Sequence, residues 1–161
     1  MSEEPRGLTH VDAAGQARMV DVSAKPVTVR EAVATGLVRC APHVVAALRD
    51  ASVPKGDVLA VARLAGIQAT KRTPDLVPLA HPVAVHGVVM DVEVVDAGVS
   101  LRASVRTAER TGVEMEALTA VAVAGLAVVD MVKALDRESE ITDVRVVAKR
   151  GGRSGDWVRG G

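Results

Sequence analysis

The chain has 161 residues, 48% hydrophobic and 25% charged, so it is long enough for one globular domain with a sizeable core. Twenty basic and twenty acidic residues cancel and aromatic residues are nearly absent, which argues against nucleic-acid binding and requires any anion site to be a local cluster. Cys40 is the single cysteine, which excludes an internal disulfide, and the polar N-terminus and the lack of a membrane-length apolar run predict a cytoplasmic protein without a membrane span.

The first half of the chain is predicted to hold one strand and two helices. Residues 1–20 are polar without periodicity, and residues 27–40 alternate with a period of two and favour a strand, although a helix is possible there. Pro42 suits the first turn of a helix over residues 42–50, and Asp57 can cap a second helix that ends near residue 72. A loop with three prolines is expected over residues 73–83.

The second half is predicted to hold three strands and one long helix. Residues 85–95 and 99–107 are Val-rich and alternating, and Gly98 between them suits a hairpin turn. A central helix is expected within residues 111–137, followed by a last strand over residues 141–149. This order of elements is typical of a ferredoxin-like (split βαβ) α+β fold, an antiparallel sheet with helices packed on one face.

We interpret the chain as a single ferredoxin-like catalytic domain over residues 21–150. A flexible N-terminal segment, residues 1–20, is expected to precede it, and a Gly/Arg-rich tail, residues 151–161, to follow it.

The central helix combines an apolar body with charged ends. Residues 120–129 carry no polar side chain, so the helix is expected to be enclosed by other elements. Asp130 and Lys133 are three residues apart and therefore share a helix face. Buried charge is costly unless it is paired or used, which leaves two interpretations open: an internal salt bridge, or an acid/base pair with pKa values tuned by partial burial.

Glu114 and Glu116 stand at the start of this helix, where carboxylates favour the helix dipole. Glu116 and Asp130 are 14 residues apart, which places them on one face to within about 40° but roughly 21 Å apart along the axis. Two copies of the helix packed antiparallel across a two-fold axis would bring Glu116 of one subunit to Asp130 of the other. We therefore hypothesise active sites at a homodimer interface.

Other candidates lie in loops. Pro78 and Pro82 stiffen the loop that carries His81, which is either a functional imidazole or an ordinary polar residue; the other histidines show no metal-ligand spacing with it. Residues 149–155 combine glycines with Lys and Arg, as in an anion-binding nest or a solvated tail. Lys55 is a fixed cation between Pro54 and Gly56.

Several long motifs carry a resemblance from about Leu8 to Asp156: LTHVDAAGQARMVDVSAKP, KGDVLAVARLAGIQATKRTPDLVPLAHPV, TGVEMEALTA, DMVKA and AKRGGRSGD. Together they resemble the molybdenum cofactor biosynthesis protein C (MoaC) family, the cyclic pyranopterin monophosphate synthases. The resemblance implies conversion of 3′,8-cyclo-7,8-dihydro-GTP to cyclic pyranopterin monophosphate with release of pyrophosphate. It implies no required cofactor, leaves open whether Mg²⁺ accompanies the triphosphate, and implies hexamers built as trimers of dimers.

Carried over to this chain, the resemblance implies an acid/base role for Asp130 with Lys133 as its partner, and catalytic roles for Lys55 and His81. Ala80 stands where the family often has Cys, and Arg153 where Lys is frequent. The predicted substrate-binding residues are Leu79, Ala80, His81, Glu114, Met115, Glu116, Lys25, Arg30, Lys71, Lys149 and Arg153. No metal ligands are predicted.

The alternative is a non-catalytic, ferredoxin-like module that binds a nucleotide or pterin for regulation. Both interpretations need the basic residues and a small-molecule ligand, but only the enzyme needs Asp130 and Lys133. Neither needs nucleic acid or a membrane as a partner.

Overall fold

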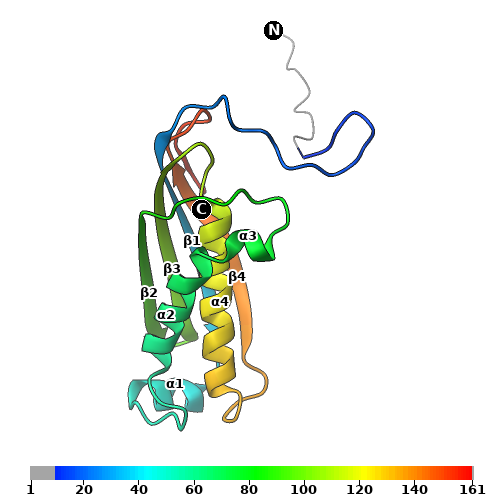
Figure 1. Cartoon of the computed structure of the whole chain (residues 1–161). Helices are drawn as coiled ribbons and strands as arrows, with labels where there is room; N and C mark the ends of the chain where they lie inside the picture. Colours follow the sequence, from blue (N-terminus) through cyan, green and yellow to red (C-terminus); the bar gives the residue numbers. More distant parts are fainter. Residues whose placement is uncertain (1–9, 161) are drawn as a thin grey trace.

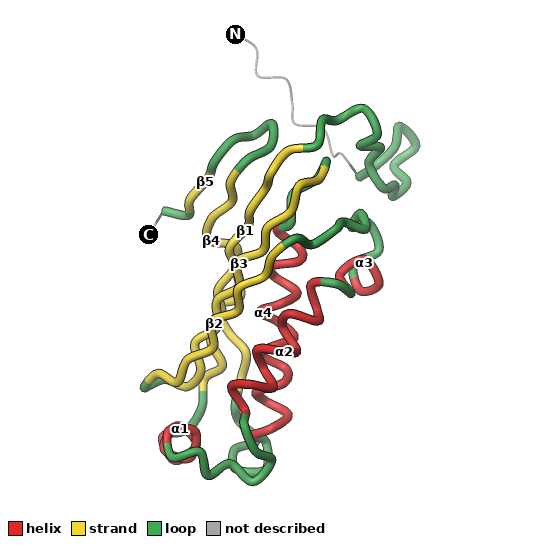
Figure 2. Tube along the Cα trace, turned by 60° about the vertical axis from the view of Figure 1, so that its left-hand side comes forward, coloured by secondary structure: helices red, strands yellow, loops and turns green. Residues whose placement is uncertain are grey.

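The structure is a computed structural model that describes residues 10–160. One five-stranded sheet with strand order β2-β3-β1-β4-β5 forms a single layer, every neighbouring pair is antiparallel, and α2 and α4 lie side by side on one of its faces (Figures 1 and 2). The elements are β1 (Thr28–Arg39), α1 (Pro42–Arg49), α2 (Val58–Thr70), α3 (Thr73–Leu76), β2 (Gly87–Val95), β3 (Gly98–Glu109), α4 (Glu114–Val132), β4 (Glu140–Arg150) and β5 (Trp157–Val158). The ferredoxin-like prediction is confirmed.

The core is formed by small aliphatic side chains between the sheet and the two long helices. β1 pairs with β3 along its whole length, from Thr28 opposite Glu109 to Arg39 opposite Gly98. In β2 and β3 the buried residues that point to the helices alternate with less buried ones, as the period of two predicts, whereas in β1 three consecutive residues, 32–34, are buried. The hydrophobic residues of β1 and β3 that are completely buried are Ala32, Ala34, Val38, Val99, Leu101, Ala103 and Val105. Short side chains allow α4 to approach the sheet closely.

α4 is buried on its sheet side but not all round. Ala120, Val121 and Ala124 are fully buried, whereas Leu126 is 58% exposed. The prediction of a fully enclosed helix is therefore wrong for the single chain. By length and composition alone, α4 is long and apolar enough to cross a membrane, contrary to the expectation that no segment reaches that length. In this structure it packs as a core helix against the sheet and α2.

The helices and strands lie close to where the sequence predicts them, but the structure adds two short elements, α3 and β5. The Asp57 carboxylate caps α2 by accepting a hydrogen bond from the main-chain N–H of Ala60 at 3.0 Å, as predicted. The three-proline loop contains the short helix α3, which Pro74 can begin because a first-turn residue needs no N–H donor. Trp157 and Val158 of the predicted tail pair with β4. Residues 1–9 of the predicted flexible segment lie outside the described residues.

α4 connects two ends of the molecule, and both ends matter for the site. Its N-terminal end lies near the start of β1 and the loop between β4 and β5, and its C-terminal end lies near the loop between α1 and α2 (Figure 1).

Candidate active site

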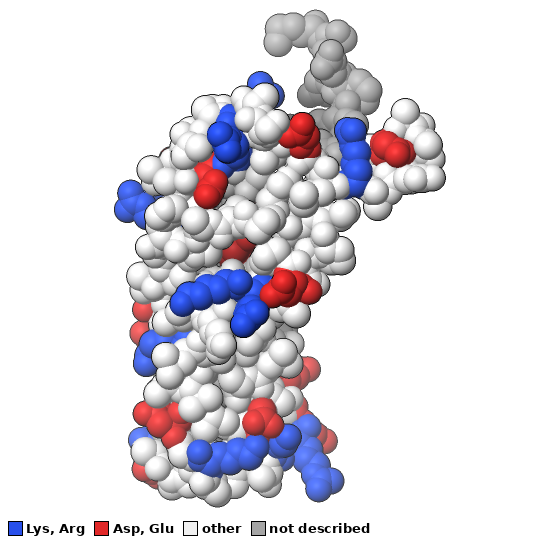
Figure 3. All heavy atoms as spheres, in the orientation of Figure 1, with Lys and Arg blue, Asp and Glu red and all other residues white. Residues whose placement is uncertain are grey.

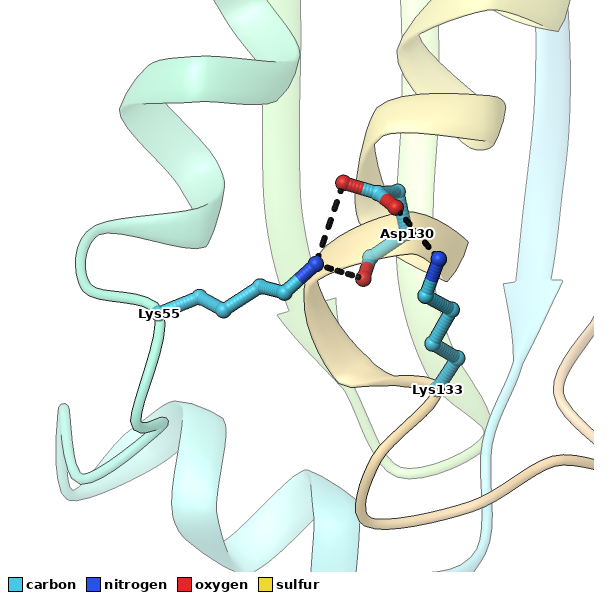
Figure 4. A network of polar contacts seen from close by, with 3 residues as sticks. All are labelled: Lys55, Asp130 and Lys133. Carbon is cyan, nitrogen blue, oxygen red and sulfur yellow. Dashed lines mark hydrogen bonds and ion pairs between the residues drawn. The ribbon is translucent and has the colours of Figure 1, made fainter.

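Lys55, Asp130 and Lys133 meet at the C-terminal end of α4 and form what we call the Asp130 cluster (Figure 4). Lys55 reaches from the loop before α2, donating to the main-chain oxygen of Asp130 at 2.9 Å and to its Oδ2 at 3.3 Å. Lys133 donates to Oδ1 of Asp130 at 2.8 Å from the next helical turn. Three residues predicted to be catalytic are thus brought together, although Lys55 is 75 positions from Asp130.

The charges of the Asp130 cluster are paired but not buried. The side chains of Asp130 and Lys133 are 59% and 58% exposed, so the expected partial burial is wrong for the single chain. The hydrogen bond from Lys133, followed by that from Lys55, lowers the pKa of Asp130 below its ordinary value. Asp130 is therefore a carboxylate at neutral pH, and the side chains of Lys55 and Lys133 flank it.

A pocket of about 550 Å³ lies at the opposite end of α4, and we call it the His81 pocket. Its walls come from the proline-rich loop, the first turn of α4 and the segment before β1. Nε2 of His81 contacts the main-chain oxygen of Val20, so the N-terminal segment fixes the imidazole. The predicted residues that line this pocket are Lys25, Leu79, Ala80, His81, Met115 and Glu116.

Glu116 is the buried carboxyl of the His81 pocket, with a relative exposure of 3%. Burial raises its pKa above the ordinary value, and the charge of neighbouring Glu114 acts in the same direction. Glu114 lies 3.9 Å from Nζ of Lys149, which adds an ion pair to its place at the start of the helix. A carboxyl whose pKa is raised can donate a hydrogen bond to a ligand more readily than an ordinary one.

A second pocket of about 490 Å³ adjoins the first, because Lys25 lines both. We call it the basic pocket, since Lys25, Arg30 and Arg153 line it. The chain after β4 folds back to form its wall: Gly151 and Gly152 adopt positive φ angles of 79° and 80°, which favour glycine. The main-chain N–H of Gly151 donates to Oδ1 of Asp156 at 3.0 Å and closes this loop.

The structure places the other predicted residues less centrally. Lys149 contacts the hydroxyl of Ser154 and lines neither pocket, and Lys71 is the exposed C-cap residue of α2. A lysine at this end of a helix is favoured by the helix dipole, and Lys71 does not line either pocket, so its position does not support the predicted substrate-binding role. Sequence reasoning did not single out Val20, Val22 or Thr28, which line the pockets; their only signal was their position in or next to the long N-terminal motif.

Within one chain the two ends of the site remain apart. Glu116 and Asp130 both belong to α4, and the helical rise separates them by about 21 Å. No single small ligand can touch the Asp130 cluster and the His81 pocket of the same protomer.

Fold and site together define a ferredoxin-like α+β protein with a carboxylate–lysine cluster and a basic pocket. The MoaC family model matches residues 19–152, and the chain belongs to that family. A protein of Streptomyces coelicolor named cyclic pyranopterin monophosphate synthase is 64% identical over 152 residues, which cover 94% of this chain and 89% of that protein. Proteins of the same name from Nocardioides and Roseiflexus are 59% and 56% identical, covering 99% and 94% of this chain and 99% and 97% of theirs.

Proposed function

We propose that this protein is a cyclic pyranopterin monophosphate synthase, a lyase of molybdenum cofactor biosynthesis in the cytoplasm. It converts 3′,8-cyclo-7,8-dihydro-GTP to cyclic pyranopterin monophosphate and releases pyrophosphate. The observation that carries the proposal is the sequence identity of 64% and 59% to two proteins of that name, over 94% and 99% of this chain. The Asp130 cluster supports it, because a regulatory module would have no use for a paired carboxylate and two lysines at the helix end.

Each part of the site has a chemical task in this reaction. The His81 pocket holds the purine-derived ring, with His81 and Glu116 as its polar groups. The basic pocket holds the phosphates, where fixed cations stabilise the charge on departing pyrophosphate. Asp130 takes up and returns protons during the ring rearrangement, and Lys55 and Lys133 position its carboxylate and stabilise negative charge on the substrate.

The separation along α4 requires a second copy of the chain. We propose that two protomers pack their α4 helices antiparallel, so that the Asp130 cluster of one completes the His81 pocket of the other. The outer face of α2 and α4 suits such a contact: Val61, Leu64 and Leu126 are exposed there although they are large and apolar. Figure 3 shows broad uncharged areas on this face between separate groups of charged side chains. A hexamer of three such dimers follows the family resemblance.

Subunit mixing tests the shared site. Glu116→Ala and Asp130→Asn, each inactive alone, should recover activity when unfolded together and reassembled. Random pairing makes half of the dimers mixed, and each mixed dimer has one intact site of two. The expected recovery is therefore about a quarter of wild-type activity. A mixture as inactive as its components would contradict the shared site while leaving the synthase activity of the wild type intact.

Replacing Leu126 by Asp tests the interface itself. A carboxylate in the middle of the apolar face should prevent pairing, so sedimentation velocity should show a smaller species and turnover should fall with it. Val89→Asp is the matched control, because Val89 is also exposed but lies on the opposite, open face of the sheet. Loss of the two-fold pair in both variants would argue against this particular face.

The reaction itself is tested with the cyclised nucleotide. Purified protein without added cofactor should form cyclic pyranopterin monophosphate and one equivalent of pyrophosphate, identified by mass spectrometry and a phosphate assay. Residues 10–160 offer no cluster of three His, Cys, Asp or Glu side chains for a metal ion, so Mg²⁺ that accompanies the triphosphate would be held mainly by phosphate oxygens. Unchanged substrate after long incubation would refute the proposal.

A further inference from the structure

Asp136 lies in the turn that follows α4, and its carboxylate joins this turn to the start of α1. Oδ1 accepts the main-chain N–H of Glu138 at 2.8 Å, and Oδ2 accepts the main-chain N–H of Ala41 at 3.1 Å. Oδ2 also accepts the hydroxyl of Ser139 at 3.2 Å. Ala41 is 95 positions away along the chain, so its bond to Asp136 is a tertiary contact and not part of the local turn.

A second contact joins the same two segments. Nε2 of His43, in the first turn of α1, lies 2.9 Å from the main-chain oxygen of Leu135. A carbonyl oxygen only accepts hydrogen bonds, so Nε2 carries a proton and donates it. We call these two contacts, from Asp136 to Ala41 and from His43 to Leu135, the Asp136 link.

The Asp136 carboxylate also takes the place of a helix cap. The main-chain hydrogen bonds from Glu138 and Ala41 lower the pKa of Asp136 below its ordinary value, so the group is a carboxylate at neutral pH. Ala41 is the N-cap residue of α1 and has no polar side chain with which to cap it. The turn after α4 therefore supplies the negative charge that favours the start of α1.

The Asp136 link joins the two segments that supply the lysines of the Asp130 cluster (Figure 4). Lys133 is the C-cap residue of α4, three positions before Asp136. Lys55 follows α1 after a run of turns, in which main-chain N–H groups donate back to the last residues of α1. Each lysine thus stands on a segment that one end of the link holds.

The chain leaves the core at the end of α4. Val132 is fully buried, whereas Lys133 and Ala134 are exposed. Helix ends that bury no side chains open more readily than the rest of a helix. Lys133 reaches Oδ1 of Asp130 only while residues 130–133 keep their helical spacing. The Asp136 link fixes the chain just beyond this point.

We propose that Asp136 is a positioning residue of the Asp130 cluster: it holds the last turn of α4 closed and thereby keeps the ammonium group of Lys133 against the Asp130 carboxylate. Through α1 it also restrains the segment that carries Lys55. This inference rests on the proposed function and adds to it a residue that lines neither substrate pocket. Asp136 acts through Lys133 and does not touch the substrate.

Hydrogen exchange of the assembled, full-length protein, followed by mass spectrometry, tests the structural part. Asp136→Ala should speed exchange in peptides over residues 129–138 and 41–49 and leave α2 unchanged, because the link is local. Asp96→Asn is the matched control, since Asp96 accepts a hydrogen bond from Nη2 of Arg49 at 2.6 Å at the other end of α1. This control should leave residues 129–138 as protected as in the wild type. A uniform rise of exchange along the whole chain would mean a general loss of stability and would overturn the positioning role.

Turnover of the cyclised nucleotide tests the functional part. Asp136→Ala should lower kcat by about tenfold, because a small displacement of catalytic groups is enough for such a loss. KM should stay within about twofold, since both pockets are intact. The acid limb of the kcat profile should move to higher pH: the hydrogen bond from Lys133 is the main cause that lowers the pKa of Asp130, and a loosened Lys133 lets this pKa rise. Asp96→Asn should resemble the wild type in kcat, KM and pH profile.

The remaining outcomes decide against the inference. Unchanged kcat with faster exchange over residues 129–138 would show that the Asp136 link serves the fold alone, and a raised KM with unchanged kcat would place the effect in binding. If Asp136→Ala does not assemble, His43→Phe removes only the bond to Leu135 and carries the same test, with a loss of kcat of about threefold. Absent turnover in the wild type would refute the proposed function, whereas normal turnover in both the wild type and Asp136→Ala would refute only the role of Asp136.

Discussion

Lys55 binds Asp130 twice, through the main-chain oxygen at 2.9 Å and through the carboxylate at 3.3 Å. The main-chain bond places the ammonium group at the negative end of the α4 dipole, where cations are favoured. Lys55 is therefore positioned by the helix end as well as by the charge of Asp130. Neutralising that charge should leave the lysine in place.

This relationship predicts that Asp130→Asn is a chemical lesion rather than a structural one. Turnover should fall by about two orders of magnitude or more, because a general acid/base group is lost while the helix end still holds Lys55. The melting temperature should change little, since an exposed ion pair contributes little to stability. Initial rates of pyrophosphate release and thermal unfolding measure the two effects.

Asp91→Asn provides the comparison for this variant. Asp91 and Arg102 form an equally exposed ion pair on the sheet, at 4.0 Å. Its loss should leave turnover unchanged and shift the melting temperature as little as Asp130→Asn does. A large loss of stability in Asp130→Asn alone would favour the structural interpretation of the cluster.

Glu116→Gln should change the pH dependence of stability. Burial raises the pKa of Glu116 in the folded state, so ionising it there costs free energy, and its contribution to stability is lost as the pH rises through the folded pKa. Glutamine cannot ionise. The variant should therefore be more stable than the wild type at neutral pH, and this advantage should shrink as the pH falls through the raised pKa of folded Glu116 and reach its minimum below 4.5, the ordinary value. Urea unfolding at a series of pH values measures it; an advantage that grows towards acid would contradict the assignment.

The sheet and the long helices could be predicted because local patterns determine them. The buried residues of β3 alternate with a period of two, and α4 begins within the predicted segment and ends before residue 133. The exposure of Asp130 could not be predicted in this way, because it depends on which elements cover the end of α4. The contact of Lys55 with Asp130 joins positions 75 apart, and only the family resemblance indicated it. The contact of His81 with Val20 had no local signal at all.

Ala51 stands just beyond α1 with a positive φ of 51°, where glycine is usual. An alanine in this conformation is strained by about 1–2 kcal/mol, and replacing it by glycine removes this strain. Part of the resulting stabilisation is lost, because glycine increases the conformational entropy of the unfolded chain. Ala51→Gly should therefore stabilise the protein by about 0.5–1 kcal/mol in urea unfolding. Ala46→Gly, within α1 and also exposed, should instead destabilise it by about 1 kcal/mol. The same sign for both variants would contradict this explanation.

Gly36 lets α4 pack closely against β1, because it lies opposite Val121 of that helix. The position of α4 matters for the site because both of its ends carry predicted site residues. A Cβ at this position would lie 2.6 Å from Cγ1 of Val121, so Gly36→Ala should destabilise the fold by about 1–3 kcal/mol. Shortening the helix residue should relieve the clash: Gly36→Ala combined with Val121→Ala should be less destabilised than the sum of the two single variants, by about 1 kcal/mol in a double-mutant cycle. Gly87→Ala is the control, because a Cβ there meets only Cβ of Arg106 at 3.9 Å and should be tolerated. Strict additivity of the Gly36 and Val121 effects would show that the clash is absorbed elsewhere, and that this contact does not determine how closely the helix approaches the sheet.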